Sequence, residues 1–436
     1  MKTAVIAFER PVTGNLYTKL AQVIYPQSLI LSISNFRGKA DIWTGDFLNS
    51  KQGVATTFLF DQYAEEIIQR CRFLRSINKS KAYDLAARFW WFVENLFKKY
   101  NIIAVFQPMI DEYTLDIMQR VASLHNVPVV SFVGHFFNGY FRITTRGELN
   151  ILRDEPSSEE VDSVCAEILQ DSYKPSFESV TKKSQIQIAK SFFRRKIIEN
   201  IYYPIKKIIE RDPYNYHYNT LILKGRGLAC ISRKRYQEFS DLEDISKLSR
   251  KQTVYLPLHV IPEATTDYWC DSCDFVHYEE GISKLIQYSD KDVIFIIKEH
   301  PSMDGWRNPD FYRRLNKFPN VYFISPYVNS NALLNLVDNV VVHTGSVGVE
   351  ALMRGKRVFC LTSSYYSDLH PAAMKVNTIK SSMLKLKIPK YDNRTFVCEI
   401  LKGLYPGVWN PKNLQSILSQ DALICASRKY LERYYG

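Results

Sequence analysis

Short apolar runs alternate with segments of helical periodicity along much of this chain of 436 residues. In the first 150 residues, Thr3–Phe8 is an apolar run of the length of a buried strand. Ile102–Phe106 and Val127–Val133 are two more such runs, and Tyr113–Leu124 between them repeats apolar residues at intervals of three and four. A strand, a helix and a strand in this order form a βαβ unit, which requires a parallel sheet. Two further helices are predicted at Gln62–Ile77 and Ala82–Lys99.

The same alternation is clearer between residues 252 and 375. Strands are predicted at Thr253–Leu258, Val293–Lys298, Val321–Ile324, Asn339–His343 and Arg357–Leu361. Helices are predicted at Glu280–Tyr288, Phe311–Phe318 and Ser330–Val337. Thr344–Gly348 is a glycine loop that leads into a short helix, which Gly355 ends. Regular alternation of strands and helices predicts a second α/β domain with a parallel sheet.

The segment between the two α/β regions, residues 151–250, has a different pattern. Within it, Thr181–Arg211 has only two acidic residues, Glu199 and Glu210, and its Ile, Phe and Tyr residues are interleaved with basic ones. Nine basic residues lie there: Lys182, Lys183, Lys190, Arg194, Arg195, Lys196, Lys206, Lys207 and Arg211. Such a basic amphipathic segment is typical either of contact with an anionic membrane or of a linker helix whose apolar stripe is packed inside.

Composition adds information mainly through the net charge. Hydrophobic residues at 46% and charged residues at 23% are typical of a globular chain and exclude a disordered, collagen-like or disulfide-scaffold protein. Lys and Arg exceed Asp and Glu by 57 − 45 = 12, which indicates attraction to an anionic partner such as a lipid surface or a phosphorylated small molecule. No segment has the pattern of a nucleic-acid-binding module, so we expect no nucleic-acid partner.

The N-terminal segment and the cysteines favour a cytoplasmic location. The first apolar run is too short for a secretory signal, and no run of about 18 apolar residues predicts a transmembrane helix. Among eight cysteines, Cys270 and Cys273 form the one close pair, followed by His277. A structural zinc site usually needs a second pair of ligands, which is not evident, so we expect no metal.

Two motifs directly follow predicted strands of the second α/β region. Lys298-Glu299-His300-Pro301 follows Val293–Lys298, and Lys and His together suit a phosphate as a point charge and a directional donor. The alternative is a surface turn with incidental charges. Because ligands of open parallel sheets bind at the carboxyl ends of the strands, the position favours a binding site.

The glycine loop Thr344-Gly345-Ser346-Val347-Gly348-Val349-Glu350 follows the strand Asn339–His343. Its glycines allow the backbone to approach a ligand, Thr344 and Ser346 offer hydroxyls, and the N–H groups at a helix start attract an anion. Glu350 would repel a phosphate, so it is better suited to accept hydrogen bonds from ribose hydroxyls, or else it complements the helix dipole. Together the two motifs predict a nucleotide-phosphate site.

A third motif, residues 257–266 (PLHVIPEATT), follows the first strand of this region. His259 and Glu263 are candidates for a donor, a base or a binding group. The alternative is a loop that contains a buried histidine with its hydrogen bonds satisfied.

These three motifs, PLHVIPEATT, KEHP and HTGSVGVEALMRGKRV, resemble the bacterial capsule and surface-polysaccharide biosynthesis proteins over about residues 250–375. That family includes transferases of Kdo (3-deoxy-D-manno-octulosonic acid). The resemblance implies a GT-B-like α/β architecture, with two Rossmann-like domains, at 1–150 and 251–412, and a largely helical basic insertion at 151–250. It further implies that a C-terminal helix in 413–436 packs back on the N-terminal domain.

The resemblance also implies a nucleotide-sugar donor held by the C-terminal domain, commonly a CMP-linked acidic sugar, with no bound metal or other cofactor. By this resemblance His300 contacts the donor phosphate, and Thr344 and Ser346 help to hold it. Capsule Kdo transferases often have an acidic pair before a glycine in the N-terminal domain. The nearest stretch here, residues 134–142, has Asn138 instead, so the candidates for the acceptor side are His135, Arg142 and Glu148.

The leading hypothesis is a glycosyltransferase that transfers a Kdo-like sugar from a CMP-sugar to a glycan or lipid-linked acceptor. We expect it at the inner face of the inner membrane, with membrane contact through 181–211. One alternative is a nucleotide-sugar 2-epimerase on the same scaffold, although Val260 stands where those enzymes have an arginine after the histidine. Another is a non-catalytic, membrane-docked assembly partner.

Overall fold

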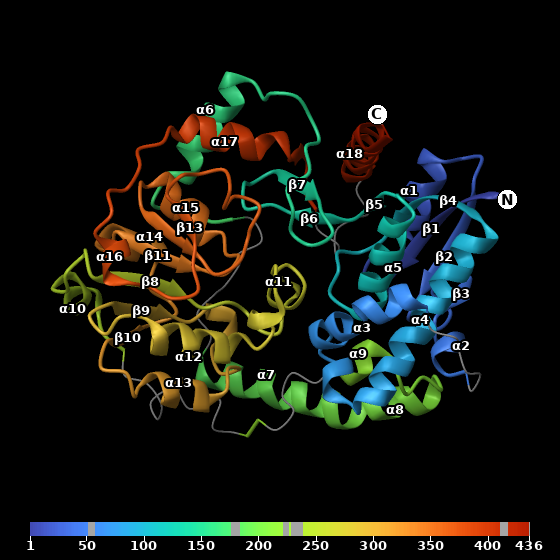
Figure 1. Cartoon of the computed structure of the whole chain (residues 1–436), viewed down its shortest axis with the longest axis horizontal. Coiled ribbons are helices and arrows are strands. Elements are labelled where there is room, and N and C mark those ends of the chain that lie inside the picture. Colours follow the sequence, from blue (N-terminus) through green and yellow to red (C-terminus); the bar gives the residue numbers. More distant parts are fainter. Residues whose placement is uncertain (51–56, 176–183, 221–225, 228–238, 410–416, 436) are drawn as a thin grey trace. The chain divides into compact units, whose positions relative to one another are not determined.

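The computed structural model describes residues 1–50, 57–175, 184–220, 226–227, 239–409 and 417–435. It divides into two compact units (Figure 1). Unit 1 consists of Met1–Glu155, Glu199–Leu221 and Leu401–Gly436, and unit 2 consists of Pro156–Ile198 and Ile222–Ile400. The basic insertion expected at 151–250 is therefore shared between the two units rather than separate from both.

Unit 1 is built on a parallel sheet of five strands in the order β3-β2-β1-β4-β5. The strands are β1 (Thr3–Glu9), β2 (Leu29–Ser34), β3 (Ile42–Trp43), β4 (Asn101–Phe106) and β5 (Val129–Val130). β1 is the central strand, and Ala4 to Phe8 are completely buried. Burial on both faces explains why this strand is a continuous apolar run rather than an alternating one. Strand order reverses between β1 and β4, the position where ligands bind in sheets of this type.

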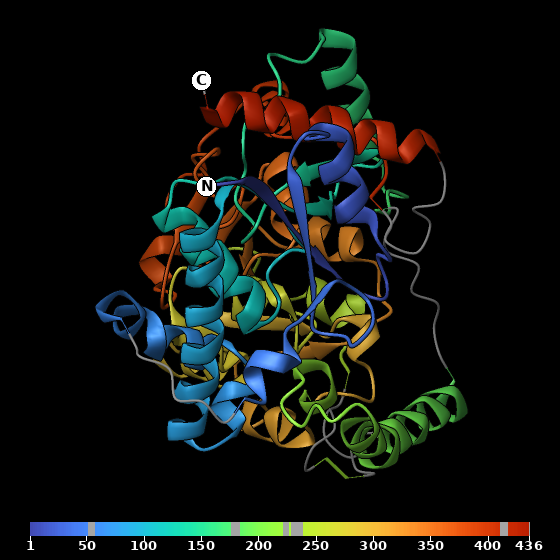
Figure 2. The same cartoon turned by 90° about the vertical axis from the view of Figure 1, so that its right-hand side faces the viewer.

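The helices of unit 1 pack in two groups. α1 (Leu16–Ile24) lies beside α18 (Ile417–Tyr435), and α4 (Lys79–Lys99) packs against α3 (Phe58–Arg70) and α5 (Tyr113–Leu124) (Figure 2). Leu423 and Ala426 of α18 share a core cluster with Val5 of β1. The C-terminal helix thus packs on this unit, although its expected first residues lie outside the described part of the chain. The remaining elements are α2 (Gly45–Leu48), the 3-10 turn Leu74–Ser76, α8 (Tyr203–Ile209) and α9 (Tyr216–Asn219).

The strand expected at Val127–Val133 is two strands. β5 stays in the parallel sheet, and β6 (Phe132–Gly134) pairs antiparallel with β7 (Tyr140–Ile143), which pairs with β14 (Tyr405–Pro406). The chain leaves the first sheet at Ser131, whose hydroxyl donates to the Pro108 carbonyl at 3.3 Å. An apolar run records burial but not the strand that each residue pairs with, so the prediction of one strand was wrong.

Unit 2 has a parallel sheet of six strands in the order β10-β9-β8-β11-β12-β13. The strands are β8 (Thr253–Pro257), β9 (Ile294–Lys298), β10 (Val321–Ile324), β11 (Asn339–Val342), β12 (Arg357–Cys360) and β13 (Ala373–Lys375). Its first five strands have the same order as those of unit 1. The fold class predicted from the sequence, α/β with two Rossmann-like domains of the GT-B type, is confirmed.

Unit 2 contains the helices predicted at Glu280–Tyr288, Phe311–Phe318 and Ser330–Val337, together with several helices that were not predicted. Its helices are α6 (Ser158–Ile168), α7 (Gln185–Ile197), α10 (Leu242–Ser246), α11 (Ala264–Asp267), α12 (Tyr278–Tyr288), α13 (Pro309–Leu315), α14 (Ser330–Leu336), α15 (Val347–Met353), α16 (Ser381–Leu384) and α17 (Asn393–Lys402), with 3-10 turns at Cys273–Phe275 and Pro301–Met303. Gly355, directly beyond α15, has φ = +66°, the left-handed conformation expected of a glycine that ends a helix.

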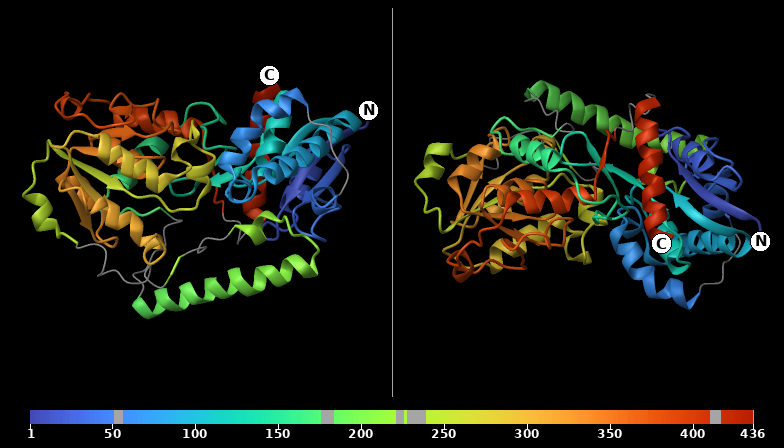
Figure 3. Two further views of the ribbon diagram at one scale, coloured as in Figure 1. Left: turned by 60° about the horizontal axis from the view of Figure 1, so that its bottom comes forward. Right: turned by 90° about the horizontal axis from the view of Figure 1, so that it is seen from above.

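The predicted basic helix is continuous where the structure describes it. α7, a π-helical turn at Ile198–Tyr202 and α8 follow one another without a break from Gln185 to Ile209 (Figure 3). Its expected first residues, including Lys182 and Lys183, lie outside the described residues. In the described part of the chain, no helix combines the length and the apolar character that crossing a bilayer requires.

Candidate functional site

The three motifs of unit 2 meet at one edge of its sheet. β8, β9 and β11 are neighbours, with β8 in the middle, and all three are parallel, so the residues after them emerge side by side. The Leu258 N–H donates to the Lys298 carbonyl at 2.8 Å. His259 Nε2 accepts a hydrogen bond from the Thr344 backbone N–H at 3.2 Å. The sequence-predicted binding residues after β8, β9 and β11 therefore converge within one unit.

His259 connects two of these motifs. Because its Nε2 accepts from Thr344, the neutral ring carries its proton on Nδ1. Its backbone N–H donates to the Tyr278 hydroxyl at 3.1 Å, and its carbonyl accepts from Arg307 at 2.5 Å. Burial, together with the charges of His300 and Arg307, lowers the pKa of His259 to about 3. Through these contacts His259 holds the glycine loop, with Nε2 engaged by the Thr344 N–H.

We expect the free energy of unfolding to fall as the pH is lowered from about 6.5, because the unfolded histidine then takes up a proton that folded His259 refuses. This stability is present above the unfolded pKa and is lost progressively towards the folded pKa of about 3. Urea unfolding at several pH values measures the slope. His259→Gln keeps an acceptor for Thr344 but does not titrate, so its slope should be shallower; an unchanged slope would contradict this account of His259.

The KEHP motif is organised by a buried ion pair. Glu299 is 4% exposed and accepts from Arg307, which is 1% exposed, with Nη2 to Oε1 at 3.0 Å. The Tyr312 hydroxyl and the His300 backbone N–H donate to the same carboxylate, at 2.5 and 2.7 Å. Glu299 therefore fixes the turn after β9, while Lys298 lies buried at the strand's last position.

His300 caps the short 3-10 turn that begins at Pro301. Its Nδ1 accepts from the Ser302 N–H at 3.2 Å, so the neutral ring carries its proton on Nε2. Burial is the main reason why the pKa of His300 lies below its ordinary value, which favours this neutral form. The ring is only partly buried. The site thus offers a directional N–H donor, in an orientation fixed by the cap.

The glycine loop is held from behind by Tyr366. The Tyr366 hydroxyl donates to the Gly345 carbonyl at 2.7 Å, and its ring fills the space where a side chain on Gly348 would project. Thr344, Gly345 and Ser346 remain partly exposed. The Thr344 hydroxyl and both ring nitrogens of His343 are buried and have no hydrogen-bond partner within the described residues. This edge therefore contains polar groups whose hydrogen-bonding capacity the unit itself does not use.

The two acidic candidates in unit 2 lie on either side of this loop. Glu350 is in the first turn of α15 and is 9% exposed. Glu263 precedes α11 in the loop after β8, is partly exposed, and accepts from the Thr265 hydroxyl at 2.8 Å. Both positions agree with a role at the edge of the sheet, without assigning one.

The acceptor-side candidates predicted in unit 1 belong to the antiparallel hairpin and the loop after it. His135 is buried, accepts on Nδ1 from the Phe137 N–H at 3.0 Å, and has a pKa well below its ordinary value through burial and the nearby charge of Arg142. Arg142 lies buried on β7. Glu148 accepts from the backbone N–H groups of Thr145 and Arg146 at 2.6 and 2.7 Å, so it stabilises its own turn.

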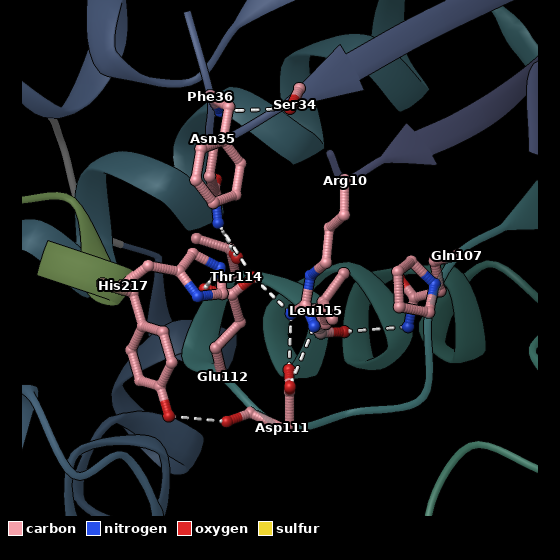
Figure 4. A network of polar contacts seen from close by, with 12 residues as sticks. Arg10, Ser34, Asn35, Phe36, Gln107, Asp111, Glu112, Thr114, Leu115 and His217 are labelled. Atoms are coloured by element: carbon pink, nitrogen blue, oxygen red, sulfur yellow. Dashed lines mark hydrogen bonds and ion pairs between the residues drawn. The ribbon is translucent and has the colours of Figure 1, made fainter. Parts of the chain in front are cut away.

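A charged cluster that the sequence reasoning missed lies at the carboxyl edge of the unit 1 sheet (Figure 4). Arg10 follows β1, Asn35 follows β2, and Asp111 and Glu112 lie between β4 and α5. Arg10 donates to Asp111 at 2.8 Å and to Glu112 at 2.6 Å, and Asn35 Nδ2 donates to Glu112 at 2.9 Å. Arg10 and Asn35 directly follow their strands, whereas Asp111 and Glu112 come five and six residues after β4, so the sequence carried little signal for this cluster.

The cluster is ionised despite its burial. Burial raises the pKa of Glu112, but the charges of Arg10 and His217 together outweigh it and hold that pKa below the usual value. The pKa of Asp111 is lowered against burial by the charge and hydrogen bond of Arg10 together with the charges of His217 and Arg72. His217 lies on α9, in the part of unit 1 formed by residues 199–221. Its Nε2 is 3.7 Å from Glu112 Oε2. At the end of β1, burial raises the pKa of Glu9 to about 7. Unit 1 thus places an acidic pair at the point where its strand order reverses.

Two Rossmann-like units, each with polar groups at the carboxyl edge of its sheet, define an α/β protein with two nucleotide-binding-type folds. The model of the family "Capsule polysaccharide biosynthesis protein" matches residues 116–369, which is more than half of the chain. The chain therefore belongs to the capsule polysaccharide biosynthesis protein family. The comparison with curated proteins gave no match.

Solved structures with some similarity include two from Thermosulfurimonas dismutans. KpsC, beta Kdo 2,7 transferase, is 12% identical with a TM-score of 0.37, covering 91% of this chain and 89% of that chain. KpsC, beta Kdo 2,4 transferase, is 14% identical with a TM-score of 0.32, covering 76% and 93%. UDP-GlcNAc 2-epimerase from Methanocaldococcus jannaschii is 12% identical with a TM-score of 0.24, covering both chains fully at 100%.

Proposed function

We propose that this protein is a glycosyltransferase of capsule polysaccharide synthesis whose nucleotide-sugar donor binds at the carboxyl edge of the unit 2 sheet. The observation that carries the proposal is the convergence of His259, His300 and the glycine loop at the ends of three adjacent parallel strands. A partly exposed loop that enters a helix, beside a fixed N–H donor and a lysine, is suited to an anionic phosphate.

The proposed reaction is displacement at the anomeric carbon of the donor sugar. The oxygen of an acceptor hydroxyl forms the new bond to the anomeric carbon and gives up its proton to a base. The bond to the leaving phosphate breaks, and negative charge builds on its oxygens. His300 Nε2–H, the Lys298 ammonium and the backbone N–H groups of the glycine loop stabilise that charge, so this part of the reaction uses no bound metal. Glu350 is proposed to accept hydrogen bonds from the ribose.

The acceptor, a glycan or a lipid-linked glycan, is proposed to bind in unit 1. Asp111 is ionised and partly exposed, so its carboxylate is suited to accept hydrogen bonds from sugar hydroxyls. Glu112 is completely buried and holds Arg10 and Asn35 in place. The assignment of Asp111 replaces the role first given to Glu148, whose carboxylate is engaged in its own turn. Because sugar nucleotides are cytoplasmic substrates, the proposed location is the inner face of the inner membrane.

The donor is proposed to be a CMP-linked, Kdo-like sugar. The support is the family together with the KEHP motif, and the test is thermal stabilisation by CMP, CDP, UDP and GDP at equal concentration. A ligand at about 100 times its dissociation constant adds ~2.7 kcal/mol. Stabilisation by CMP alone is expected, and stabilisation by UDP alone would contradict the proposed donor class. In a separate product assay without acceptor, turnover of the donor would indicate an epimerase.

We expect His300→Asn to lose most of the stabilisation by nucleotide while the protein remains folded. Asparagine is a good N-cap and can still accept from the Ser302 N–H, so the turn at Pro301 keeps its cap. It does not extend an N–H to the position of Nε2. The loss of one charge-assisted hydrogen bond costs about 1.5–3 kcal/mol, which is roughly a tenfold or greater weakening of binding. Wild-type affinity in His300→Asn, measured by calorimetry, would refute the assignment of His300.

A further inference from the structure

The helical run from α7 through α8 buries Ile188 and Phe192 but exposes most of its other large apolar residues. Eight large apolar side chains that are exposed lie in this run: Ile186, Phe193, Ile197, Ile201, Tyr202, Ile205, Ile208 and Ile209. Their exposed fractions range from 49% for Ile205 to 77% for Ile208. The positions recur mostly at intervals of three, four and seven, which places most of them on one stripe of a helix.

The two carboxylates of the run are buried or paired, whereas two of its basic residues are exposed. Glu199 is 4% exposed, and Glu210 accepts from Lys206 Nζ at 2.9 Å and from the Tyr218 hydroxyl at 2.8 Å. Lys190 and Arg194 are exposed among the apolar residues. A surface helix of a globular protein normally turns its apolar stripe inward and its charges outward. The interpretation of this segment as a linker with its apolar stripe packed inside holds for Ile188 and Phe192, which are each 1% exposed, but not for the exposed apolar residues.

We infer that the exposed stripe of α7–α8, defined by Ile186, Phe193, Ile197, Ile201 and Ile208, lies on a bilayer that contains anionic lipid. Aliphatic and aromatic side chains enter the boundary between headgroups and acyl chains, and the basic residues beside them contact the lipid phosphates. Charge complementarity favours anionic lipid as the partner of the stripe. The exposed charges next to the stripe are positive, and the two carboxylates of the run are buried or paired. The orientation is in the plane of the interface, as the run is too polar to cross it.

The test is flotation of the full-length chain with vesicles of phosphatidylcholine, with and without phosphatidylglycerol. We expect binding to the anionic vesicles that weakens as salt is raised. Phe193→Glu combined with Ile197→Glu should lower the partition coefficient by about tenfold or more, since two inserted side chains become anionic. Lys190→Gln combined with Arg194→Gln should lower it by about fivefold per charge removed.

The matched control is Phe58→Glu combined with Leu59→Glu on α3, where the wild-type side chains are 76% and 42% exposed. This variant makes the same chemical change elsewhere and should bind vesicles like the wild type. Circular dichroism and the melting temperature establish that each variant is folded. Wild-type binding by Phe193→Glu/Ile197→Glu, or no binding of the wild type to anionic vesicles, would overturn the inference.

Light scattering without vesicles tests the alternative that the stripe contacts a second copy of this chain instead of lipid. A dimer that dissociates in Phe193→Glu/Ile197→Glu, together with no vesicle binding by the wild type, would assign the stripe to self-association and overturn the lipid surface. The vesicle assay involves no sugar chemistry, so its failure would leave the proposed glycosyltransferase activity standing. Failure of the nucleotide test would likewise leave the membrane surface standing.

Discussion

Gly348→Ala is expected to destabilise unit 2 and to abolish detectable nucleotide binding. A Cβ at position 348 would lie 2.7 Å from Cζ of Tyr366 and closer still to its hydroxyl. Tyr366 is completely buried and cannot move away without losing its hydrogen bond to the Gly345 carbonyl. Overpacking of this kind costs ~1–3 kcal/mol. The displaced tyrosine would also release the glycine loop from the position in which it is proposed to bind phosphate.

The expected loss of stability in Gly348→Ala is opposite in sign to the usual effect of this substitution. Gly348 lies in α15, and replacing a glycine within a helix by alanine ordinarily stabilises a protein by ~0.5–1 kcal/mol. Gly345→Ala is the matched control, because its Cβ would meet His259 Nε2 at 3.4 Å, an ordinary contact. Urea unfolding and calorimetry with the stabilising nucleotide measure both properties. A Gly348→Ala protein as stable as the wild type, or more stable, would refute the role of Tyr366 in fixing the loop.

Arg307→Met is expected to have the largest effect on stability, a loss of ~3–5 kcal/mol. Removing the guanidinium leaves the Glu299 carboxylate buried without its counter-ion, although Tyr312 still donates to it. It also removes the donor to the His259 carbonyl, so the turns after β8 and β9 lose their common support. The unfolding free energy from urea titration measures the loss.

Two comparisons separate this mechanism from a general effect of removing charge. Arg313→Met breaks the 2.7 Å ion pair with Asp310 on α13, but the two side chains are 53% and 59% exposed, so we expect a loss of at most ~1 kcal/mol. Arg307→Met combined with Glu299→Gln removes both charges and should be less destabilised than Arg307→Met alone. If the double variant is as unstable as the single one, the buried ion pair is not the cause.

The apolar pattern predicted several elements of each unit correctly because it records which residues are buried. Ile102–Phe106, Val321–Ile324 and Tyr113–Leu124 are elements of the structure almost to the residue. The apolar pattern gave a wrong prediction where residues that are all buried pair with different strands. Val127–Val133 is buried throughout most of its length, yet its two halves belong to different sheets. No pattern within a single segment records which distant strand it will pair with.

The donor-side candidates were accessible to sequence reasoning because each follows its own strand within one local motif. The acidic pair of unit 1 was not. Asp111 and Glu112 lie five residues or more beyond β4, and their partner Arg10 follows a strand about a hundred residues earlier. Only the parallel order β2-β1-β4 brings these strand ends together. The search for an acid near Asn138 followed a local sequence motif. In the structure, Asp111 and Glu112 meet Arg10 because β4 and β1 are neighbours in the sheet.

The sequence by itself determined the α/β class, two parallel sheets and the position of the three unit 2 motifs at the carboxyl ends of strands. These depend on local periodicity and on the rule that parallel strands end at the same edge. The tertiary structure decided what each side chain does there. In the folded protein His259 accepts a hydrogen bond from Thr344 of the glycine loop, and Glu299 pairs with Arg307. The apolar stripe of α7–α8 remains exposed. The physical reason is that hydrogen-bond partners and burial are set by residues distant in sequence.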